Sequence, residues 1–485
     1  MEHSGTAITR VSTGINGLDE ILHGGLKSGR AYLVRGGPGC GKTTLGLHFL
    51  STGAARGEQT LYISLGEPEA QIRDDAQGLQ IPLDNITFLD LSPSPEFFSE
   101  GSSYDIFSPA EVEREPMMQS IRESIETLRP ARVFVDSMTQ FRYLSTDSFH
   151  FRKQALSFMR YLVEQDATVL VTSEGTQEIP DDDLQFMADG IIHLDFGAEG
   201  RTITISKFRG SSFRSGAHSM SLSEHGMAVF PRLVPSKQRI EQVLEPLSSG
   251  VPELDEMLHG GIDRGTSTII SGPTGVGKTT FGMQFIKEAA GRGDSSVVYT
   301  FEEGVNSLLR RCNTISIPAR AMVERGTLLV EHVEPLRYSP DEFATMVREE
   351  VLSNSRRIVM IDSLSGYRLS MQGRDLISHV HALTVYLKSL GVTVILINEV
   401  EAITGEFRAT DDKVSYLADS VIFMRYLELG GELRKAIGVL KKRSGDFEKT
   451  LRKLEITRYG LKVGRPLSEL RGILSGSPEF VAPNE

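Results

Sequence analysis

The sequence predicts an α/β fold of two tandem domains, each a mostly parallel, doubly wound sheet flanked by helices. Three observations support this prediction. A G-x-x-x-x-G-K-T loop occurs twice, as GGPGCGKT at residues 36–43 and as GPTGVGKT at residues 272–279. Around each loop, apolar runs of strand length alternate with helical segments, as in parallel sheets that are covered on both faces. The surroundings of the two loops also align at a constant offset, as the pair Lys42 and Lys278 shows.

The repeat defines the domain organisation. TGINGLDEILHGGLKSG at residues 13–29 aligns with SGVPELDEMLHGGIDRG at residues 249–265. A repeat unit of this length is a whole domain, because solenoid repeats are far shorter. We therefore expect four segments: an N-terminal domain at 1–232, a polar linker at 233–248, a C-terminal domain at 249–470 and a short tail at 471–485.

Composition narrows the classes of function. The 485 residues carry a net charge of −12, and the pI is about 5.5, which argues against a nucleic-acid binder. No run of about 18 apolar residues is present, so we expect no membrane span. The N-terminus has no apolar signal sequence, and the only cysteines are Cys40 and Cys312. These features together predict a cytoplasmic protein.

Each glycine-rich loop predicts a phosphate-binding site. Glycines let successive backbone N–H groups point at phosphate, while the lysine reaches the β- and γ-phosphates and the next threonine offers its hydroxyl to Mg²⁺. We therefore expect ATP and Mg²⁺ as cofactors, with Thr43 and Thr279 as metal ligands. Cys40 is interpreted as a small loop residue and not as a redox switch. The predicted nucleotide-binding residues are Gly37, Gly39, Cys40, Gly41, Lys42, Thr43 and Thr44 in the first copy, and Thr274, Gly275, Val276, Gly277, Lys278, Thr279 and Thr280 in the second.

Two buried-strand patterns end in an aspartate. RVFVDSMT at 132–139 delivers Asp136, and RIVMIDSLS at 357–365 delivers Asp362. An apolar strand ending in Asp is common, but after a phosphate loop it is typical of the Walker B motif, whose carboxylate holds Mg²⁺. We therefore predict both aspartates as nucleotide-site and metal-site residues.

Glutamates end the strand that follows each phosphate-loop helix. TLYISLGE at 60–67 ends in Glu67, and SVVYTFEEG at 296–304 contains Glu302 and Glu303. Chemistry in open α/β sheets collects at the C-terminal ends of strands, where a carboxylate can orient or deprotonate a nucleophile. We predict these three residues as catalytic. The alternative is that they are solvated acids at the start of a helix, where negative charge is favourable.

Each copy later shows a pair of basic residues on a β-hairpin. GIIHLDF and RTITISKFRG are expected to pair, and the second strand carries Lys207 and Arg209; AIGVLKKRSG carries Lys441 and Arg443. Strand alternation places the two charges of each pair on one face, which suits phosphate binding. The alternative is a solvated basic edge that protects the sheet. Before the first hairpin, the acidic segment EIPDDDLQFMADG at 178–190 is expected to be a loop.

The order of these motifs resembles the RecA-like core of P-loop NTPases. Two such copies, each opened by GxxxLDExLHGG, with the glutamate pair, the K-x-R pairs and RYLELGGELRKAIGVLKKR at 425–443, are similar to the KaiC family of circadian-clock ATPases and autokinases. The resemblance covers about residues 8–478.

The resemblance implies two tandem RecA-like domains in a double-ring homo-hexamer, with ATP between neighbouring subunits and a signalling or timing role. The N-terminal ring would hydrolyse ATP, and the C-terminal ring would act as a serine/threonine autokinase. Glu67 matches the second of two N-terminal catalytic glutamates in the family, and Glu302 and Glu303 match the C-terminal pair. The residues that would reach the neighbouring subunit's phosphates are Lys207, Arg209, Lys441 and Arg443.

Several positions depart from the family pattern. The adjacent Ser–Thr phosphosite falls on Ser415 and Tyr416, and Thr410 matches a third hydroxyl nearby. Gly66 replaces the first N-terminal catalytic glutamate. The sequence ends soon after residues 473–480, so the resemblance implies no KaiA-type regulation, while a KaiB-like or other signalling partner stays open.

Two other functions are compatible with the same core. A DNA-dependent motor of the RecA or DnaB type would need a basic pore, and the sequence lacks a basic stretch interleaved with aromatic residues. A scaffold in which ATP only stabilises assembly would need no catalytic base, and Gly66 favours this reading for the first copy.

Overall fold

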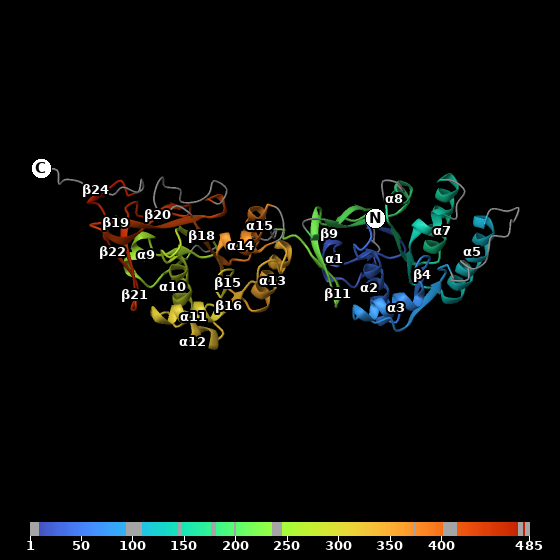
Figure 1. Ribbon diagram of the computed structural model, residues 1–485, viewed down its shortest axis with the longest axis horizontal. Helices are drawn as coiled ribbons and strands as arrows, with labels where there is room; N and C mark the ends of the chain where they lie inside the picture. The colour runs from blue at the N-terminus through green and yellow to red at the C-terminus, as the bar shows by residue number, and fades with distance from the viewer. Residues whose placement is uncertain are drawn as a thin grey trace, which may run out of the picture. The chain divides into compact units, whose positions relative to one another are not determined.

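The computed structural model shows a chain of two compact units, Met1–Arg232 and Leu233–Glu485 (Figure 1). Each unit is described on its own below. The structure describes residues 9–93, 109–143, 148–175, 181–197, 200–234, 245–371, 375–400, 415–473 and 479–480.

The first unit contains a nine-stranded sheet in the order β11-β10-β9-β8-β3-β7-β6-β4-β5. The six strands from β8 to β5 are parallel, and β9, β10 and β11 extend them in antiparallel fashion. The strands are β3 (Ala31–Arg35), β4 (Thr60–Ser64), β5 (Ile86–Asp90), β6 (Arg132–Asp136), β7 (Thr168–Ser173), β8 (Gly190–Gly197), β9 (Gly200–Phe208), β10 (Ala217–Ser223) and β11 (Gly226–Phe230), beside the short pair β1 (Arg10–Val11) and β2 (Leu26–Lys27).

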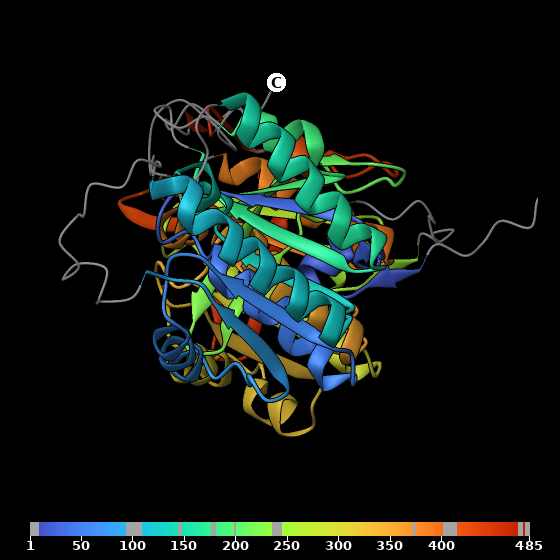
Figure 2. The same cartoon turned by 90° about the vertical axis from the view of Figure 1, so that its right-hand side faces the viewer.

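Helices cover both faces of this sheet because its strands are apolar on both sides. Tyr32 and Val34 of β3 pack with α1, α2 and α3, whereas Leu33 packs with α5, α6, α7 and α8. Figure 2 shows α5 and α7 crossing in front of the sheet. The helices are α1 (Asn16–Ile21), α2 (Lys42–Ala55), α3 (Glu69–Gly78), α5 (Pro109–Leu128), α6 (Met138–Tyr143), α7 (Ser148–Glu164) and α8 (Asp182–Met187).

The second unit repeats this topology strand for strand, in the order β22-β21-β20-β19-β14-β18-β17-β15-β16. The strands are β14 (Ser267–Gly272), β15 (Ser296–Thr300), β16 (Leu328–His332), β17 (Ile358–Asp362), β18 (Thr393–Glu399), β19 (Ser420–Leu429), β20 (Glu432–Lys442), β21 (Arg452–Thr457) and β22 (Gly460–Pro466). Two short pairs accompany them: β12 (Pro246–Leu247) with β13 (Ile262–Asp263), and β23 (Leu470–Arg471) with β24 (Glu479–Phe480). Strand β12 thus lies inside the range 233–248.

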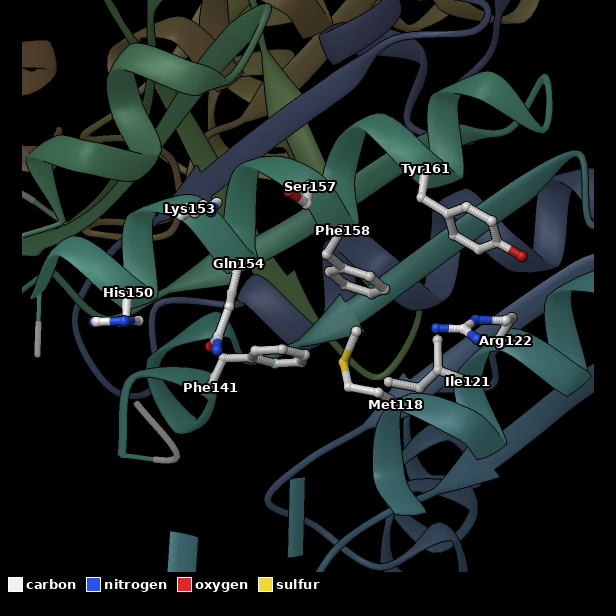
Figure 3. A pocket seen from close by; sticks show the side chains of 10 residues that line it. All are labelled: Met118, Ile121, Arg122, Phe141, His150, Lys153, Gln154, Ser157, Phe158 and Tyr161. Atoms are coloured by element: carbon white, nitrogen blue, oxygen red, sulfur yellow. The ribbon is translucent and has the colours of Figure 1, made fainter. Parts of the chain in front are cut away.

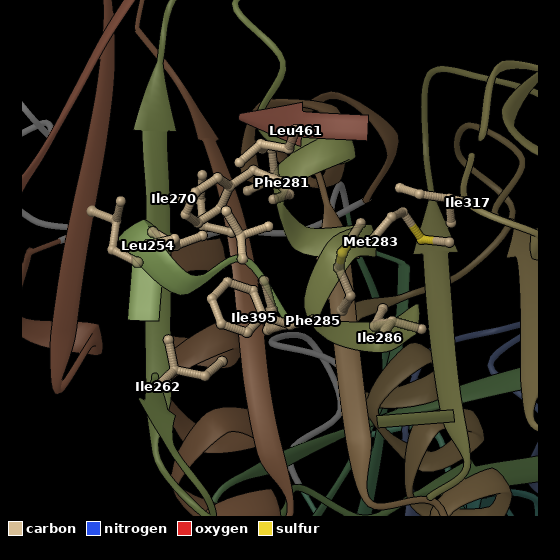
Figure 4. Packing of buried hydrophobic residues seen from close by; sticks show 14 of the residues in the cluster. Leu254, Ile262, Ile270, Phe281, Met283, Phe285, Ile286, Ile317, Ile395 and Leu461 are labelled. Carbon is tan, nitrogen blue, oxygen red and sulfur yellow. The ribbon is translucent and has the colours of Figure 1, made fainter. Parts of the chain in front are cut away.

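Two helical layers also enclose the second sheet. Figure 4 shows the layer in which Phe281, Met283 and Phe285 of α10 pack against the sheet residues Ile270 and Ile395. The opposite layer holds α13, α14 and α15. The helical elements are α9 (Pro252–Met257), α10 (Lys278–Gly291), α11 (Val305–Thr314), α12 (Ala319–Glu324), α13 (Pro340–Ser353), α14 (Leu364–Ser370), α15 (Leu376–Ser389) and the 3-10 turn η1 (Ser415–Leu417).

The predicted fold of two tandem, mostly parallel α/β sheets is therefore confirmed. One local prediction is wrong: the acidic segment 178–190 was expected to be a loop, but residues 182–187 form α8. The physical reason is Leu184, which is buried in the core between the sheet and α5, α6 and α7. A short amphipathic helix places this side chain in the core while its acidic residues stay outside. Among the described helices, none combines the length and the hydropathy of a membrane span.

Candidate functional site

Both phosphate loops join the C-terminal end of a central strand to the helix that follows. Gly41 and Gly277 immediately precede α2 and α10 and have φ values of 102° and 112°, a region that side chains strongly disfavour. A Cβ on Gly277 would also lie 2.1 Å from Ile456 Cδ1. The glycines therefore let the chain turn sharply, so that the helix N-terminus faces the loop and favours an anion there.

The ammonium group of each loop lysine contacts carbonyl oxygens of its own loop. Lys42 Nζ donates to the carbonyl oxygens of Gly36 at 2.8 Å and Gly37 at 3.0 Å, and Lys278 Nζ donates to Pro273 at 2.9 Å. Burial lowers the pKa of Lys278, although the carboxylates of Glu399 and others oppose this shift. An ammonium group held by loop carbonyls is positioned to exchange these contacts for phosphate oxygens.

In the second unit, the loop and the neighbouring strand ends enclose a cavity of about 410 Å³. Its volume is within the range of small-molecule sites. The lining residues are Thr274, Gly275, Gly277, Lys278, Thr279, Thr280, Thr300, Glu302, Glu303, Arg311, Ile315, Asp362, Ser363, Glu399, Lys435 and Ile456. The cavity thus brings together the predicted loop, metal-binding and catalytic residues of the second copy, except Val276, which is buried in the core.

The predicted metal ligands meet in both units. Thr43 Oγ1 donates to Asp136 Oδ2 at 2.7 Å, and Thr279 Oγ1 donates to Asp362 Oδ2 at 2.6 Å. The helix can approach the aspartate strand because it carries a glycine at the crossing: a Cβ on Gly46 would lie 2.2 Å from the ring of Phe134.

These groups fit Mg²⁺, which is held in nucleotide sites by one or two protein oxygens together with water and phosphate. Within the described residues, no cluster of three or more His, Cys, Asp or Glu could hold a metal ion by itself. The pairs Thr43–Asp136 and Thr279–Asp362 would therefore hold Mg²⁺ only together with a bound triphosphate.

The two aspartates have different surroundings. Asp136 also accepts hydrogen bonds from the hydroxyls of Tyr62 at 3.2 Å and Thr172 at 2.5 Å. The sheet registers place Val298 and Ile397 at the matching positions of the second unit. Burial raises the pKa of Asp362 to about 6, although the hydrogen bond from Thr279 and the nearby Arg311 guanidinium lower it.

The strand-end glutamates lie beside these aspartates. The hydroxyl of Ser64 donates to the carbonyl oxygen of Glu67, and Thr300 Oγ1 donates to that of Glu303 at 2.9 Å, so both turns are fixed alike. Burial raises the pKa of Glu67, and the carboxylates of Asp136 and Asp75 raise it further. A carboxylate with raised proton affinity is suited to general-base chemistry near neutral pH.

The adjacent carboxylates of the second unit have separate partners. Glu302 Oε1 accepts from Ser363 Oγ at 2.6 Å, while Glu303 accepts from Ser307 Oγ at 2.7 Å and pairs with Arg311 at 2.5 Å. The alternative of solvated acids at a helix start is compatible with their exposure, but the hydrogen bonds orient both groups in the cavity.

The basic pairs lie at the other end of each sheet. Arg209 N–H donates to Asp189 O, and Asp189 N–H donates to the oxygen of Ala31, the first residue of β3. The phosphate loop begins after Arg35, the last residue of β3. At the usual rise per residue, the loop therefore lies about 15 Å from the end of the sheet that holds Arg209. Lys207 Nζ donates to the carbonyl oxygen of Gln185 at 2.8 Å.

The second unit shows the same arrangement. Arg443 N–H donates to Asp419 O, and Asp419 N–H donates to Ser267, which begins β14. Lys441 Nζ donates to the carbonyl oxygens of Ala418 at 2.7 Å and Ser415 at 3.1 Å. Neither basic pair is therefore near the phosphate loop of its own unit.

The phosphosite candidates share this end of the second unit. Ser415 is exposed in η1, beside Lys441. The neighbouring Tyr416 is 45% exposed, and its ring lies 5.3 Å from that of His381. Thr410 lies outside the described residues.

Sequence reasoning missed a second set of basic residues, which lie at the phosphate loops. Arg201 Nη1 donates to Gly39 O at 2.7 Å, and Lys435 Nζ donates to Gly275 O at 3.2 Å. The spacing of the two residues could have indicated them, because Arg201 precedes Lys207 by the same interval as Lys435 precedes Lys441. Arg311, Ser363 and Glu399 were also missed, since helix and strand-end positions of these types are common in any α/β protein.

A cavity of about 520 Å³ in the first unit lies away from these sites, among α5, α6 and α7 (Figure 3). Phe141 and Phe158 stack in its apolar part, with ring centroids 5.3 Å apart, while Arg122 and Lys153 line it from α5 and α7. None of the residues predicted to bind nucleotide lines this cavity.

Comparison with known proteins agrees with this geometry. The family model described as "ATPase: KaiC" matches residues 11–234 and 247–468. The circadian clock oscillator protein KaiC of Prochlorococcus marinus is 28% identical over 99% of this chain and 97% of its own length. The circadian clock protein KaiC3 of Synechocystis sp. is 27% identical over 99% and 96%, and the circadian clock oscillator protein KaiC of Synechococcus elongatus is 27% identical over 99% and 93%. Because the family model covers both repeats, the chain belongs to the KaiC family of ATPases and contains its ATP-binding core.

Proposed function

We propose that this protein binds and hydrolyses Mg²⁺-ATP, assembles into a hexameric ring and transfers phosphate from ATP to its own Ser415. One observation carries the proposal: Ser415, Lys441 and Arg443 gather at one end of the second sheet, while the phosphate loop and its glutamates lie at the other end. In this arrangement, a phosphotransfer site would be complete only where the loop end of one subunit meets the Ser415 end of a neighbour.

In the second unit, different residues would bind the phosphates, hold Mg²⁺ and orient the nucleophile during ATP hydrolysis. Lys278 and the loop N–H groups would bind the phosphates, and Thr279 and Asp362 would hold Mg²⁺. The metal, when bound, neutralises charge that develops on the phosphates. Glu303 would orient the attacking nucleophile at the strand end, and the hydrogen bond from Ser363 orients the adjacent Glu302.

The distance between the basic pairs and the loops supports assembly into a ring. A separation of about 15 Å exceeds the reach of an arginine side chain from its own strand. In a ring with head-to-tail contacts, one subunit presents its loop end to the basic end of the next. Arg443 would then stabilise the charge on the neighbour's transferring phosphoryl group, in the manner of an arginine finger.

Self-phosphorylation uses the same junction. The Ser415 hydroxyl oxygen forms a bond to the γ-phosphorus of the neighbour's ATP, the bond to the β,γ-bridging oxygen breaks, and ADP leaves. The hydroxyl proton passes to Glu303 of the subunit that holds the ATP. The exposure of Ser415 beside Lys441 supports this role, because the hydroxyl must be accessible to the active site of the neighbouring subunit.

The proposal is tested by incubating the full chain with Mg²⁺ and γ-labelled ATP and mapping phosphate by mass spectrometry. We expect label on Ser415, none on the Ser415→Ala variant and a loss of at least about 10²-fold with Glu303→Gln. In a mixture of these two variants, label should appear on Ser415 of the Glu303→Gln chain, because the Ser415→Ala subunit supplies the base. Phosphate release without any labelled protein would refute the autokinase and leave an ATPase.

A scaffold function is the second candidate, and Gly66 favours it for the first unit. The matching position in the second unit is Glu302, so the first unit has one strand-end carboxylate where the second has two. In that case ATP bound in the first unit would stabilise the ring with little turnover. Nucleotide-dependent assembly without phosphate release from a chain carrying Lys278→Ala would support it.

A further inference from the structure

Arg311 pairs with the candidate catalytic base of the second unit. Its Nη2 lies 2.5 Å from Glu303 Oε2, and the two side chains are 42% and 28% exposed. Arg311 is carried by α11, which begins two residues after Glu303. The pair is therefore formed within one strand–helix turn and does not depend on distant packing.

The Arg311 guanidinium also lines the cavity at the phosphate loop of the second unit. Arg311 borders it together with Lys278, Thr279 and Asp362. Its positive charge also lowers the pKa of Asp362 against the larger effect of burial, so it acts on the metal-binding carboxylate as well. Since the catalytic carboxylate must lie next to the terminal phosphate, a group bonded to that carboxylate is within a short movement of the same phosphate.

The first unit carries the opposite charge at this position. The constant offset that relates Glu67 to Glu303 relates Asp75 of α3 to Arg311 of α11. Asp75 is close enough to Glu67 to raise its pKa, in addition to the larger effect of burial. The two nucleotide sites thus share their loops and aspartates but differ by two charge units beside the strand-end glutamate.

We propose that Arg311 is a binding residue for the terminal phosphate of ATP, which pairs with Glu303 in the nucleotide-free chain and moves to the phosphate when ATP enters. This inference rests on the proposed function only in that the second unit must bind nucleotide. The movement would leave Glu303 free to act on a nucleophile, so the base becomes available only when a triphosphate is present.

The exchange is favourable for a simple reason. A guanidinium has five N–H donors in a planar fork and pairs well with phosphate oxygens. ADP has no phosphate at the end of the cavity next to Glu303, so the Arg311–Glu303 pair would persist with ADP. Arg311 would therefore make the second site prefer ATP to ADP, and the first site, with Asp75, would lack this preference.

The test measures nucleotide affinity and not turnover. The full chain with Lys42→Ala, which removes the lysine of the first loop, is titrated with Mg²⁺ and either ADP or the β,γ-imido analogue of ATP. We expect Arg311→Gln to weaken binding of the analogue by about tenfold or more and binding of ADP by less than about twofold. The matched control is Arg310→Gln, because this exposed neighbour on α11 does not line the cavity. Equal changes for both nucleotides, or none, would overturn the proposal.

A reciprocal variant guards against a folding defect in Arg311→Gln. In a chain with Lys278→Ala, Asp75→Arg should raise the preference of the first site for the analogue over ADP by several-fold. If Asp75→Arg leaves that ratio unchanged, the proposal is wrong even if Arg311→Gln is unstable. Failure of the Lys42→Ala chain with both arginines intact to bind either nucleotide would instead refute nucleotide binding by the second unit, and with it the proposed function.

Discussion

The hydroxyl oxygen of Thr172 lies 2.5 Å from Oδ1 of Asp136, the carboxylate oxygen that Thr43 does not contact. The first unit therefore fixes both oxygens of its aspartate, whereas the second unit has Ile397 at the matching position. This difference separates two sites that look alike in sequence.

Removing that hydroxyl should destabilise the first unit. We expect Thr172→Val to lower its free energy of unfolding by about 1–3 kcal/mol, because a hydrogen bond to a half-buried carboxylate is lost without replacement. Urea denaturation of the metal-free protein measures the effect. Thr172→Ser keeps the hydroxyl and is the control, which should cost clearly less; an unfolding free energy that Thr172→Val leaves unchanged would show that the hydrogen bond does not stabilise the unit.

Stability should also depend on pH through Asp362. Burial raises the pKa of Asp362 from 3.8 to about 6, so the folded chain keeps a proton that the unfolded chain loses. Stability from this group therefore falls as pH rises from about 4 to about 6. In metal-free buffer at pH 7.5, Asp362→Asn should raise the unfolding free energy by about 2–3 kcal/mol, and most of this gain should be lost at pH 4. A gain that is the same at both values would contradict this origin.

A helix glycine and a buried arginine should be coupled in the first unit. A Cβ on Gly53 would lie 2.5 Å from Nε of Arg132, which is fully buried and bonded to Glu58 at 2.6 Å. The second unit has Ala289 and Ile358 at these two positions.

Gly53→Ala should therefore destabilise the protein by about 1–3 kcal/mol, although alanine is the better helix former. Arg132→Ile alone should cost about 3 kcal/mol, since Glu58 and two carbonyl oxygens lose their partner. The double variant reproduces the second unit's pair and should cost clearly less than the sum of the two, as a thermodynamic cycle would show. Additive losses would mean that the two side chains do not interact.

The first unit has room for a second catalytic acid. A Cβ on Gly66 would meet only Gln140, at 3.8 Å, which is an ordinary contact. In a chain carrying Lys278→Ala, Gly66→Glu should raise phosphate release by about tenfold or more, because Ser137 could orient the new carboxylate as Ser363 orients Glu302. Gly66→Ala is the control and should change little. An unchanged rate would show that the missing glutamate does not limit the first unit.

Two inactive variants should complement each other if sites are shared between subunits. Lys278→Ala removes the loop lysine, and Arg443→Ala should lower self-phosphorylation by at least about 10²-fold. In an equal mixture, about a quarter of head-to-tail interfaces would pair an intact loop with an intact arginine. Label should then appear on Ser415 of the Lys278→Ala chain, as mass spectrometry of differently tagged chains would reveal. No label in the mixture would place Arg443 in the site of its own subunit.

The sequence by itself determined the duplication, the tandem α/β sheets and the loop residues. Glycine-rich loops and buried strands have local sequence patterns, and each pattern occurs in both repeats. The grouping of Lys42, Thr43 and Asp136 at one site could therefore be predicted from the sequence. The tertiary structure decided what distinguishes the two copies. Thr172 contacts Asp136 from the neighbouring strand, where the second unit has Ile397, and no local pattern indicates which side chains meet across a sheet. The contact of Arg311 with Glu303 is local, but its place at the cavity beside Asp362 depends on strand order. The position of the basic pairs at the far end of each sheet also depends on strand order, because pairing between distant segments fixes it.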